Sequence, residues 1–412
     1  MKNRSSPRIV IACGGTGGHL FPGVAIAEKL APRGCEVTLI ISSKEVDKQA
    51  VRGLSEAEIV TLPAVGLRRG GEVEFLIAFG KSYQLARKLF RWLRPHAVLA
   101  MGGFTSAPPI LAGKTAGART FLHESNSIPG RANRWLSWLV DRGFVGFPSA
   151  AAKLKRCPVT VCGTPVRARF QPSSSERCRS QLGLDPERPV LLVMGGSQGA
   201  GGVNEIIRRS LFTLARVAPE WQWFHLAGPR DTERLRRRYA ELNLRAIVHP
   251  FFEQMELALG AASATITRAG ASTLAELSAM RLPALLVPYP AAVDNHQMHN
   301  ARTYSSIGAA QVLDQIAATP DKVSTALLEL VRNEALRKHM QEALARLVNP
   351  GAAEEIATEI LNRIREGEVK TAAAPTFHSL PLPQGAKPPA MFRATTNLTL
   401  VPQPAREEPV SS

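Results

Sequence analysis

Two glycine-rich segments of matching design could hold a phosphate group. They read Gly14-Gly15-Thr16-Gly17-Gly18-His19 and Gly195-Gly196-Ser197-Gln198-Gly199-Ala200, and each follows an apolar run and precedes a helical pattern. Glycine permits positive φ and a close approach of the backbone to a ligand. The unpaired N–H groups at the start of a helix favour an anion. Either turn alone could be a tight turn without a ligand, whereas the pair predicts a ligand held between two facing domains.

Several common phosphate-binding classes do not fit these segments. Neither segment matches Gly-x-Gly-x-x-Gly or the P-loop pattern, and the residues after the second predicted strand, Ser42-Ser43-Lys44, lack the acidic group that grips an NAD ribose. The chain has no Asp-x-Asp pair to hold a metal-bound nucleotide diphosphate. Backbone amides, helix dipoles and arginine would therefore hold the phosphates, so we expect no cofactor and no protein metal site. Assistance by a divalent ion stays open.

Positive charge is concentrated in the first part of the chain. The net charge is +17, and residues 1–170 carry 25 basic and 10 acidic side chains. This field favours an anionic partner, either nucleic acid or an anionic membrane face. The five cysteines form no Cys-x-x-Cys pair, and no apolar run approaches the length of a membrane span. A cytoplasmic protein is therefore expected, and a disulfide-stabilised fold or a membrane bundle is disfavoured.

Short apolar runs alternate with amphipathic segments, which is typical of repeated βα units and a parallel sheet. Eleven runs read as strands: Arg8–Ala12, Glu36–Ile41, Glu58–Leu62, Ala97–Ala100, Arg119–Leu122, Gly143–Val145, Pro189–Met194, Gln222–Leu226, Leu244–Val248, Ala264–Thr267 and Ala284–Val287. Helical patterns between them include Leu20–Arg33 and Phe75–Leu93. The sequence therefore predicts an α/β protein with two Rossmann-like domains.

The domain boundaries follow from the changes in pattern along the chain. We expect one domain over 1–165, a polar linker over 166–188 and a second domain over 189–350. A further amphipathic helix is predicted over 351–367. The remainder, 368–412, contains eight of the 30 prolines without periodicity, which indicates disorder.

The residues of several motifs, and their order along the chain, resemble those of the MurG family. These are the peptidoglycan N-acetylglucosaminyltransferases that convert lipid I to lipid II. The resemblance spans roughly residues 8–345 and leaves the tail outside. Its motifs are Gly14-Gly15-Thr16-Gly17-Gly18-His19-Leu20-Phe21-Pro22-Gly23, Gly102-Gly103-Phe104, His123-Glu124-Ser125-Asn126, Gly163-Thr164-Pro165-Val166-Arg167, Gly195-Gly196-Ser197-Gln198-Gly199-Ala200, Arg268-Ala269-Gly270-Ala271-Ser272-Thr273-Leu274-Ala275-Glu276 and Asp294-Asn295-His296-Gln297.

The resemblance implies a GT-B architecture with the active site between the domains. It implies UDP-GlcNAc as the donor, held mainly by the C-terminal domain. The implied acceptor is undecaprenyl-diphosphate-linked MurNAc-pentapeptide, held by the N-terminal domain as a peripheral protein at the cytoplasmic face of the inner membrane. GlcNAc would pass to the 4-hydroxyl of MurNAc with inversion in cell wall synthesis. This membrane role agrees with the charge asymmetry and disfavours nucleic acid as the partner.

Two residues are candidates for the general base that inversion requires. His19 stands at a helix start, where the dipole favours a neutral imidazole; alternatively it hydrogen-bonds loop carbonyls or an acceptor phosphate. Glu124 is the second candidate, and a structural carboxylate paired with a helix start is its more ordinary role.

The remaining site residues follow from the resemblance. Asn126 contacts the sugar, Arg167 lies beside the donor diphosphate, Glu276 accepts from the ribose hydroxyls and Gln297 bonds GlcNAc. The phosphates meet Thr16, Gly17, Gly18, Ser197 and the helix start formed by Ala271, Ser272, Thr273, Leu274 and Ala275, and the backbone of Phe252 bonds uracil. This chain departs from the family pattern at three positions: Ser125, Thr164 and His296.

The segment Arg68–Arg94 predicts contact with a membrane. It contains seven basic and two acidic residues among aromatic and aliphatic ones. Apolar groups ringed by lysine and arginine suit shallow interfacial docking. An amphipathic helix with its apolar side in the core explains part of the same pattern, so we expect a shared role.

Two other functions stay open at this point. One is another member of the GT-B class, such as a diacylglycerol glycosyltransferase or a UDP-GlcNAc epimerase that uses the same cleft. A nucleic-acid-binding protein would explain the charge, but neither the turns nor any recognition motif.

Overall fold

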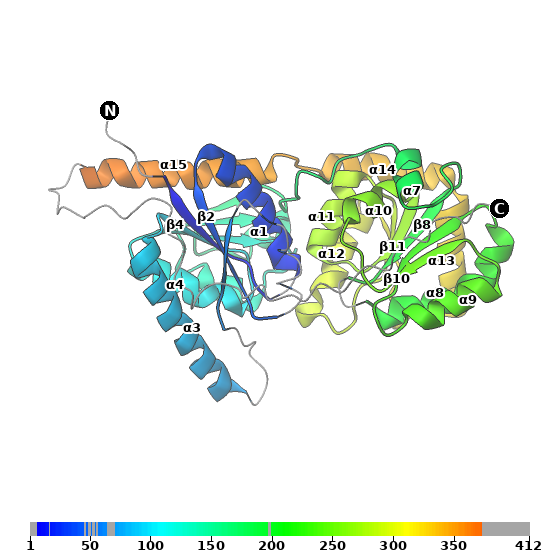
Figure 1. The fold of residues 1–412 in the computed structure, drawn as a ribbon, viewed down its shortest axis with the longest axis horizontal. Helices are drawn as coiled ribbons and strands as arrows, with labels where there is room; N and C mark the ends of the chain where they lie inside the picture. The colour runs from blue at the N-terminus through cyan, green and yellow to red at the C-terminus, as the bar shows by residue number, and fades with distance from the viewer. Residues whose placement is uncertain are drawn as a thin grey trace, which may run out of the picture.

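The computed structural model describes residues 6–15, 17–44, 47, 51, 54, 57–63, 71–196 and 199–372, without the side chains of 368–372. In this part of the chain the strands form two parallel sheets, one in each lobe (Figure 1). The N-terminal sheet has the order β3 (Glu58–Thr61), β2 (Glu36–Ile41), β1 (Arg8–Ala12), β4 (Ala97–Ala100), β5 (Arg119–Glu124), β6 (Arg142–Val145) and β7 (Val159–Val161). The C-terminal sheet has the order β10 (Ala246–His249), β9 (Gln222–Leu226), β8 (Val190–Met194), β11 (Ala264–Thr267), β12 (Ala284–Leu286) and β13 (Gln311–Val312).

Each sheet is apolar on both faces, because helices cover both sides. In β1, Ile9 and Ile11 point to the face that α1 (Gly17–Leu30) covers, while Val10 packs on the other face with α3 (Glu72–Leu93). The helices and 3₁₀ turns of the N-terminal lobe also include η1 (Ala31–Arg33), η2 (Phe104–Ser106), α4 (Ala107–Thr115), α5 (Arg131–Leu136) and α6 (Pro148–Ala151).

The C-terminal lobe repeats this plan. Leu191 and Val193 of β8 pack with α8 (Gly201–Val217), whereas Val190 and Leu192 face the opposite core cluster. The other helices and the 3₁₀ turn are α9 (Thr232–Glu241), α10 (Met255–Ala261), α11 (Ala271–Met280), η3 (Val293–Asn295), α12 (His296–Ser305), α13 (Pro320–Arg332) and α14 (Glu334–Leu347).

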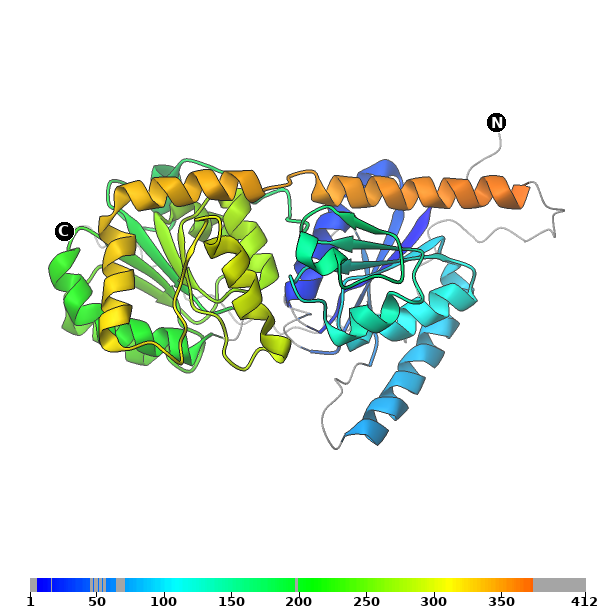
Figure 2. The ribbon, with the colours of Figure 1, turned by 180° about the vertical axis from the view of Figure 1, so that it is seen from behind.

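The last helix, α15 (Ala352–Ala372), returns to the N-terminal lobe. It packs against α1 and buries Ile356 and Ile360 in the same core cluster as Ile11. Figures 1 and 2 show it running along that lobe from the end of α14. The chain therefore passes between the lobes twice, once after β7 and once before α15.

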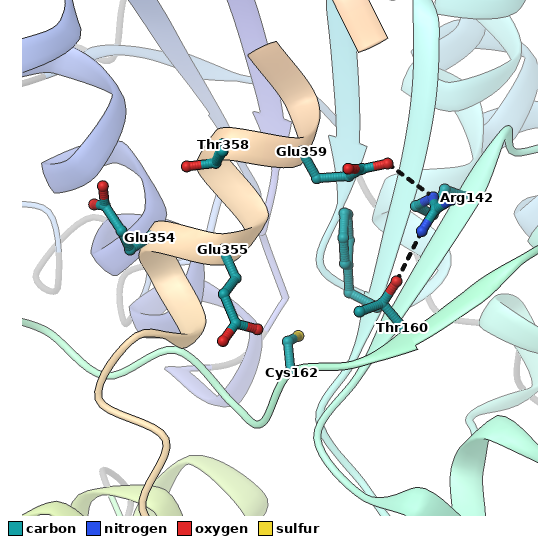
Figure 3. Close-up of a pocket in the computed structure, with 8 residues that line it drawn as sticks. Arg142, Thr160, Cys162, Glu354, Glu355, Thr358 and Glu359 are labelled. Atoms are coloured by element: carbon teal, nitrogen blue, oxygen red, sulfur yellow. Dashed lines mark hydrogen bonds and ion pairs between the residues drawn. The ribbon is translucent and has the colours of Figure 1, made fainter. Parts of the chain in front are cut away.

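A cavity of about 380 Å³ lies between α15 and the strands β6 and β7 (Figure 3). Its lining includes Cys162 and Glu355, as well as Arg142, which pairs with Glu359 at 3.0 Å. This cavity belongs to the packing of the returning helix.

Three features differ from the sequence-based expectations. The predicted linker 166–188 contains α7 (Ser175–Gln181), which Ser174 caps by accepting a hydrogen bond from the Arg177 N–H. Helix α15 ends at Ala372, so 368–372 are helical rather than part of the predicted disordered tail, and 373–412 lie outside the described residues. The short strands β7 and β13 were not predicted.

Candidate active site

The first glycine-rich loop leaves the end of β1 and enters α1. A side chain at Gly14 would collide with the backbone, because an added Cβ would lie 2.3 Å from the Ser42 nitrogen. The Gly15 N–H donates to Asp47 Oδ2 at 2.7 Å, and Thr105 Oγ1 donates to the Gly14 carbonyl at 2.6 Å. These bonds fix the entry to α1. Thr16 lies outside the described residues.

His19 lies in the first turn of α1, beside the loop that follows β4. A Cβ on Gly102 would come within 2.9 Å of His19 Nε2, so the ring packs directly on this glycine backbone. Burial lowers the His19 pKa, His296 lowers it further, and Glu124 and Asp47 oppose the shift. A neutral imidazole can accept a proton, which is the state that a general base needs.

Glu124 ends β5 and is buried. Its Oε1 accepts from the backbone and side-chain nitrogens of Asn126 at 2.9 and 3.0 Å. Its Oε2 accepts from the Gly130 N–H and from Asn133 Nδ2, both at 2.9 Å. Because four donors engage both oxygens, the geometry supports the structural role of this carboxylate over the role of base.

The starts of α1 and α11 meet between the lobes. Ser272 Oγ donates to the Gly18 carbonyl at 2.8 Å, and α11 begins after Gly270 without a side-chain cap. The first N–H groups of a helix have no acceptor within it, so both helix starts present donors here. This arrangement can hold an anion such as a diphosphate. Ala271 and Leu274 are buried beneath it, whereas Ser272, Thr273 and Ala275 are partly exposed.

Arg167 and Glu276 form a buried pair beside this point. Arg167 Nη2 lies 3.5 Å from Glu276 Oε1, and its guanidinium lies over the rings of Phe21 and Phe170 at 4.1 and 4.9 Å. Burial raises the pKa of Glu276 to about 7, and Arg167 opposes the rise. Arg167 therefore contacts Glu276, the carboxylate predicted to bind the ribose. The diphosphate is the other predicted partner of Arg167, and it would bind the same guanidinium.

The other predicted sugar and base contacts come from both lobes. The Asn126 side chain accepts from Asn300 Nδ2 at 3.1 Å, and Gln297 Oε1 accepts from the Tyr289 N–H at 2.9 Å. Phe252 is half-buried, with its ring edge-on to Phe224. Ser197 lies outside the described residues. The described residues contain no group of three or more His, Cys, Asp or Glu arranged to hold a metal ion.

The sequence matches the N-terminal domain of glycosyltransferase family 28 over residues 9–145 and its C-terminal domain over residues 190–357. A protein of Acidithiobacillus ferrooxidans named UDP-N-acetylglucosamine--N-acetylmuramyl-(pentapeptide) pyrophosphoryl-undecaprenol N-acetylglucosamine transferase is 38% identical over 85% of this chain and 96% of its own. A Geobacter protein of the same name is 31% identical over 87% and 97%. The chain belongs to the MurG family.

A solved MurG structure agrees with this assignment. The crystal structure of Acinetobacter baumannii MurG has a TM-score of 0.67 at 26% identity and covers 87% of this chain and 99% of its own. The UDP co-structure of Staphylococcus aureus MnaA has a TM-score of 0.62 at 15% identity, covering 87% and 97%, and shows a likeness of fold. The predicted GT-B architecture with two Rossmann-like lobes is confirmed.

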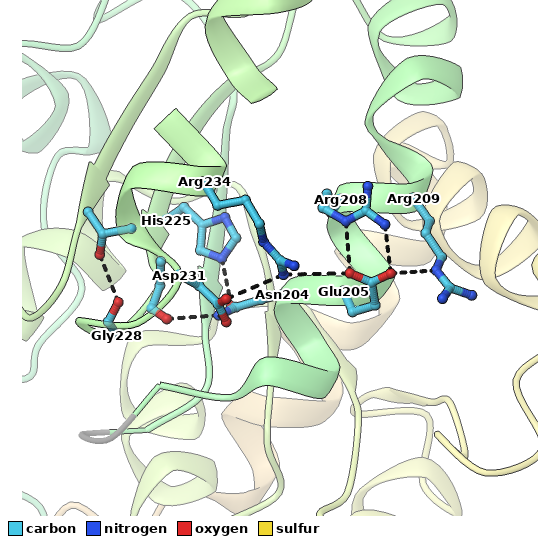
Figure 4. A network of polar contacts seen from close by, with 10 residues as sticks. Asn204, Glu205, Arg208, Arg209, His225, Gly228, Asp231 and Arg234 are labelled. Carbon is cyan, nitrogen blue, oxygen red and sulfur yellow. Dashed lines mark hydrogen bonds and ion pairs between the residues drawn. The ribbon is translucent and has the colours of Figure 1, made fainter. Parts of the chain in front are cut away.

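In this MurG family member, a buried polar network supports the second glycine-rich loop (Figure 4). Asn204 Nδ2 donates to the Ala227 carbonyl and to Asp231 Oδ2, both at 2.8 Å. A Cβ on Gly199 would lie 2.7 Å from that same carbonyl. His225 Nε2 lies 3.0 Å from Asn204 Oδ1, and since an amide oxygen only accepts, the histidine is the donor. The network thus fixes the strand end against which the loop rests.

The sequence-based interpretation did not include Asp47, Asn133, Asn204 or Asn300. Each is a single buried polar residue that satisfies loop backbone or another site residue. No local motif marks them, apart from the position of Asn204 in the first turn of the helix after the second glycine-rich loop.

Proposed function

We propose that this chain transfers GlcNAc from UDP-GlcNAc to the 4-hydroxyl of MurNAc in undecaprenyl-diphosphate-linked MurNAc-pentapeptide, with inversion at the anomeric carbon. Its relatives' names support this reaction. The observation that carries it in the structure is the meeting of α1 and α11, which brings His19 of one lobe beside the helix start of the other. Inverting transfer needs both a base and an electrostatic partner for the departing diphosphate.

The chemistry follows from these positions. His19 accepts the proton of the acceptor hydroxyl as its oxygen forms a bond to the anomeric carbon. The bond from that carbon to the β-phosphate oxygen breaks, and the electron pair leaves with UDP. The N–H groups at the start of α11 stabilise the charge on the departing diphosphate. Burial keeps His19 neutral before the step, because it lowers the imidazole pKa.

Donor recognition belongs mainly to the C-terminal lobe in this proposal. Glu276 accepts hydrogen bonds from the ribose hydroxyls and is held in place by Arg167. The backbone at Phe252 pairs with uracil, and the Nε2 of Gln297 is directed to GlcNAc because its Oε1 is engaged by Tyr289. Ser197 and the Gly17–Gly18 amides complete the phosphate contacts.

The N-terminal lobe would hold the acceptor against an anionic membrane face. The first turns of α3 expose Val73, Leu76 and Ile77 at 71, 65 and 55%, whereas Phe90 at the other end is buried in the core. This division supports the shared role predicted for α3, whose outer end projects from the lobe in Figure 1. Arg68 and Arg69 lie outside the described residues. No helix within the described part of the chain is long and apolar enough to cross a bilayer.

A transfer assay tests the proposal. Purified protein is incubated with labelled UDP-GlcNAc and a lipid I analogue, and the lipid fraction is analysed for the label. The proposal expects label in a disaccharide lipid and UDP released in equal amount. Turnover of UDP-GlcNAc without acceptor would indicate an epimerase, and transfer to diacylglycerol instead of the lipid I analogue would indicate the other GT-B alternative.

A further inference from the structure

Asn300 on α12 is a buried polar side chain at the contact between the lobes. It is fully buried, and its Oδ1 accepts from the backbone N–H and the hydroxyl of Ser127, both at 2.9 Å. Its Nδ2 donates to Asn126 Oδ1 at 3.1 Å and to the Ala269 carbonyl at 3.2 Å. Two donor and two acceptor positions are thus all used, which is the full capacity of an amide.

These four bonds join two segments of the proposed active site, one from each lobe. Asn126 and Ser127 belong to the N-terminal loop after β5, where Glu124 fixes Asn126 through two further bonds. Ala269 belongs to the C-terminal turn that leads into α11. The Asn300 side chain therefore connects the loop predicted to contact the sugar with the turn before α11, the helix proposed to bind the diphosphate.

The Asn300 hydrogen bonds are buried, whereas the Arg134–Asp294 ion pair between the lobes is partly exposed. Arg134 Nη2 and Asp294 Oδ2 lie 2.8 Å apart, but their side chains are 46 and 33% exposed. An exposed ion pair contributes little to stability because water solvates both charges and salt screens them. Breaking the Asn300 bonds leaves buried donors and acceptors unpaired, and each such group loses its full solvation without compensation. The Asn300 bonds are therefore the stronger determinant of how the two lobes align.

We propose that Asn300 is a positioning residue that aligns the acceptor loop with the donor-binding helix across the two lobes. This inference rests on the proposed function for its kinetic consequences. Asn300 is fully buried and its four bonds leave no hydrogen-bonding position for a reacting group. Its loss acts through displacement of one lobe relative to the other, and a misplacement of about 1 Å can reduce turnover by about 100-fold.

Asn300→Asp is the sharpest test, because the two side chains have the same shape. The carboxylate keeps its bonds from Ser127 but faces two oxygens, of Asn126 and Ala269, that it cannot satisfy. We expect kcat for transfer to fall by at least about tenfold. The Kd for UDP-GlcNAc, measured by calorimetry, should stay within about twofold because Glu276, Phe252 and Gln297, the proposed ribose, uracil and sugar contacts, all lie in the C-terminal lobe. Thr303→Ala on the same helix, where the exposed hydroxyl donates to the His299 carbonyl one turn earlier, is the matched control and should leave both values unchanged.

An unchanged kcat in Asn300→Asp overturns the inference. Equal losses of kcat and donor affinity also overturn it, since they would make Asn300 part of the donor site. If the variant does not fold, Ser127→Ala removes one of the bonds from the opposite lobe, and an unaltered kcat in that variant has the same meaning.

A readout independent of activity separates this inference from the proposed function. Hydrogen exchange in Asn300→Ala should accelerate in the peptides around 126–130 and 269–273 and stay unchanged in α8. If the wild type transfers no GlcNAc, the proposed function fails. The exchange pattern would still show whether Asn300 holds the two lobes together. Exchange that is unaltered in both peptides would show that Asn300 does not hold the lobes together.

Discussion

Donor binding should depend on pH through Glu276. Burial raises the pKa of this carboxyl to about 7, and Arg167, 3.5 Å away, opposes the rise. An ionised carboxylate offers two acceptor oxygens to the ribose hydroxyls, whereas the protonated form turns one of them into a donor. Binding therefore favours the ionised form, and donor affinity should increase as the pH rises through the region around 7.

The size of the effect follows from that pKa. A group with a pKa of about 7 is about one-tenth ionised at pH 6 and about nine-tenths ionised at pH 8. If the ionised form alone makes the ribose bonds, the Kd for UDP-GlcNAc is about tenfold higher at pH 6 than at pH 8, or about 1.4 kcal/mol. The diphosphate of UDP-GlcNAc is esterified at both ends and does not titrate in this range, so the change belongs to the protein.

Titration calorimetry with UDP-GlcNAc across this pH range measures the effect. Glu276→Gln removes the titrating group while keeping the shape, so its binding should be weaker and independent of pH. A wild-type Kd that is flat between pH 6 and 8 would refute the assignment of the ribose contact. A slope that persists in Glu276→Gln would place the titrating group elsewhere.

Three further perturbations test neighbouring parts of the account. His19→Ala should lower kcat by about 100-fold or more with little change in UDP affinity, and equal loss of both would make His19 a binding residue. Arg167→Met should raise the Glu276 pKa further and move the pH midpoint of donor binding upward by about one unit, because the opposing cation is lost; an unmoved midpoint contradicts the pairing. Leu76→Glu should weaken binding to anionic vesicles by about tenfold in a sedimentation assay, while Ile316→Glu, 81% exposed on the other lobe, should not.

The sequence predicted most of the strands because the central ones are continuous apolar runs. Val190–Met194 and Ala97–Ala100 are buried along their whole length, so every residue in them is apolar and the strand can be recognised from sequence. The edge strands β7 and β13 are short and half-exposed, and their residues do not form an apolar run. Their existence depends on pairing with β6 and β12, which local sequence does not encode.

Helix α15 shows a second limit of prediction from sequence. Its amphipathic pattern predicted a helix and an apolar face, but a pattern identifies a face and not its partner. The partner is α1, more than 300 residues earlier. Arg33, in the turn η1 that follows α1, donates to the Thr358 hydroxyl across a separation of 325 residues. Similarly, the polar segment before β8 was interpreted as a linker, although Cys178 and Arg179 of α7 are buried there against the C-terminal lobe.

Some residues of the candidate site could likewise be predicted from local sequence, and others could not. The glycine-rich loops and His19 were recognisable because their residue types and spacing are local. Asn300 was not, since its partner Ser127 lies 173 residues away. Glu124 was considered for two roles from the sequence, and four hydrogen bonds around its carboxylate were needed to favour one of them.

The stereochemistry of the new glycosidic bond tests the central claim most directly. In the proposed mechanism, a hydroxyl activated at His19 attacks opposite the departing diphosphate at α11, and this attack inverts the anomeric centre. Nuclear magnetic resonance of the purified disaccharide lipid, made from the α-linked UDP-GlcNAc, should show a β linkage to the MurNAc 4-hydroxyl. An α linkage, or a bond to any other hydroxyl, would contradict the account.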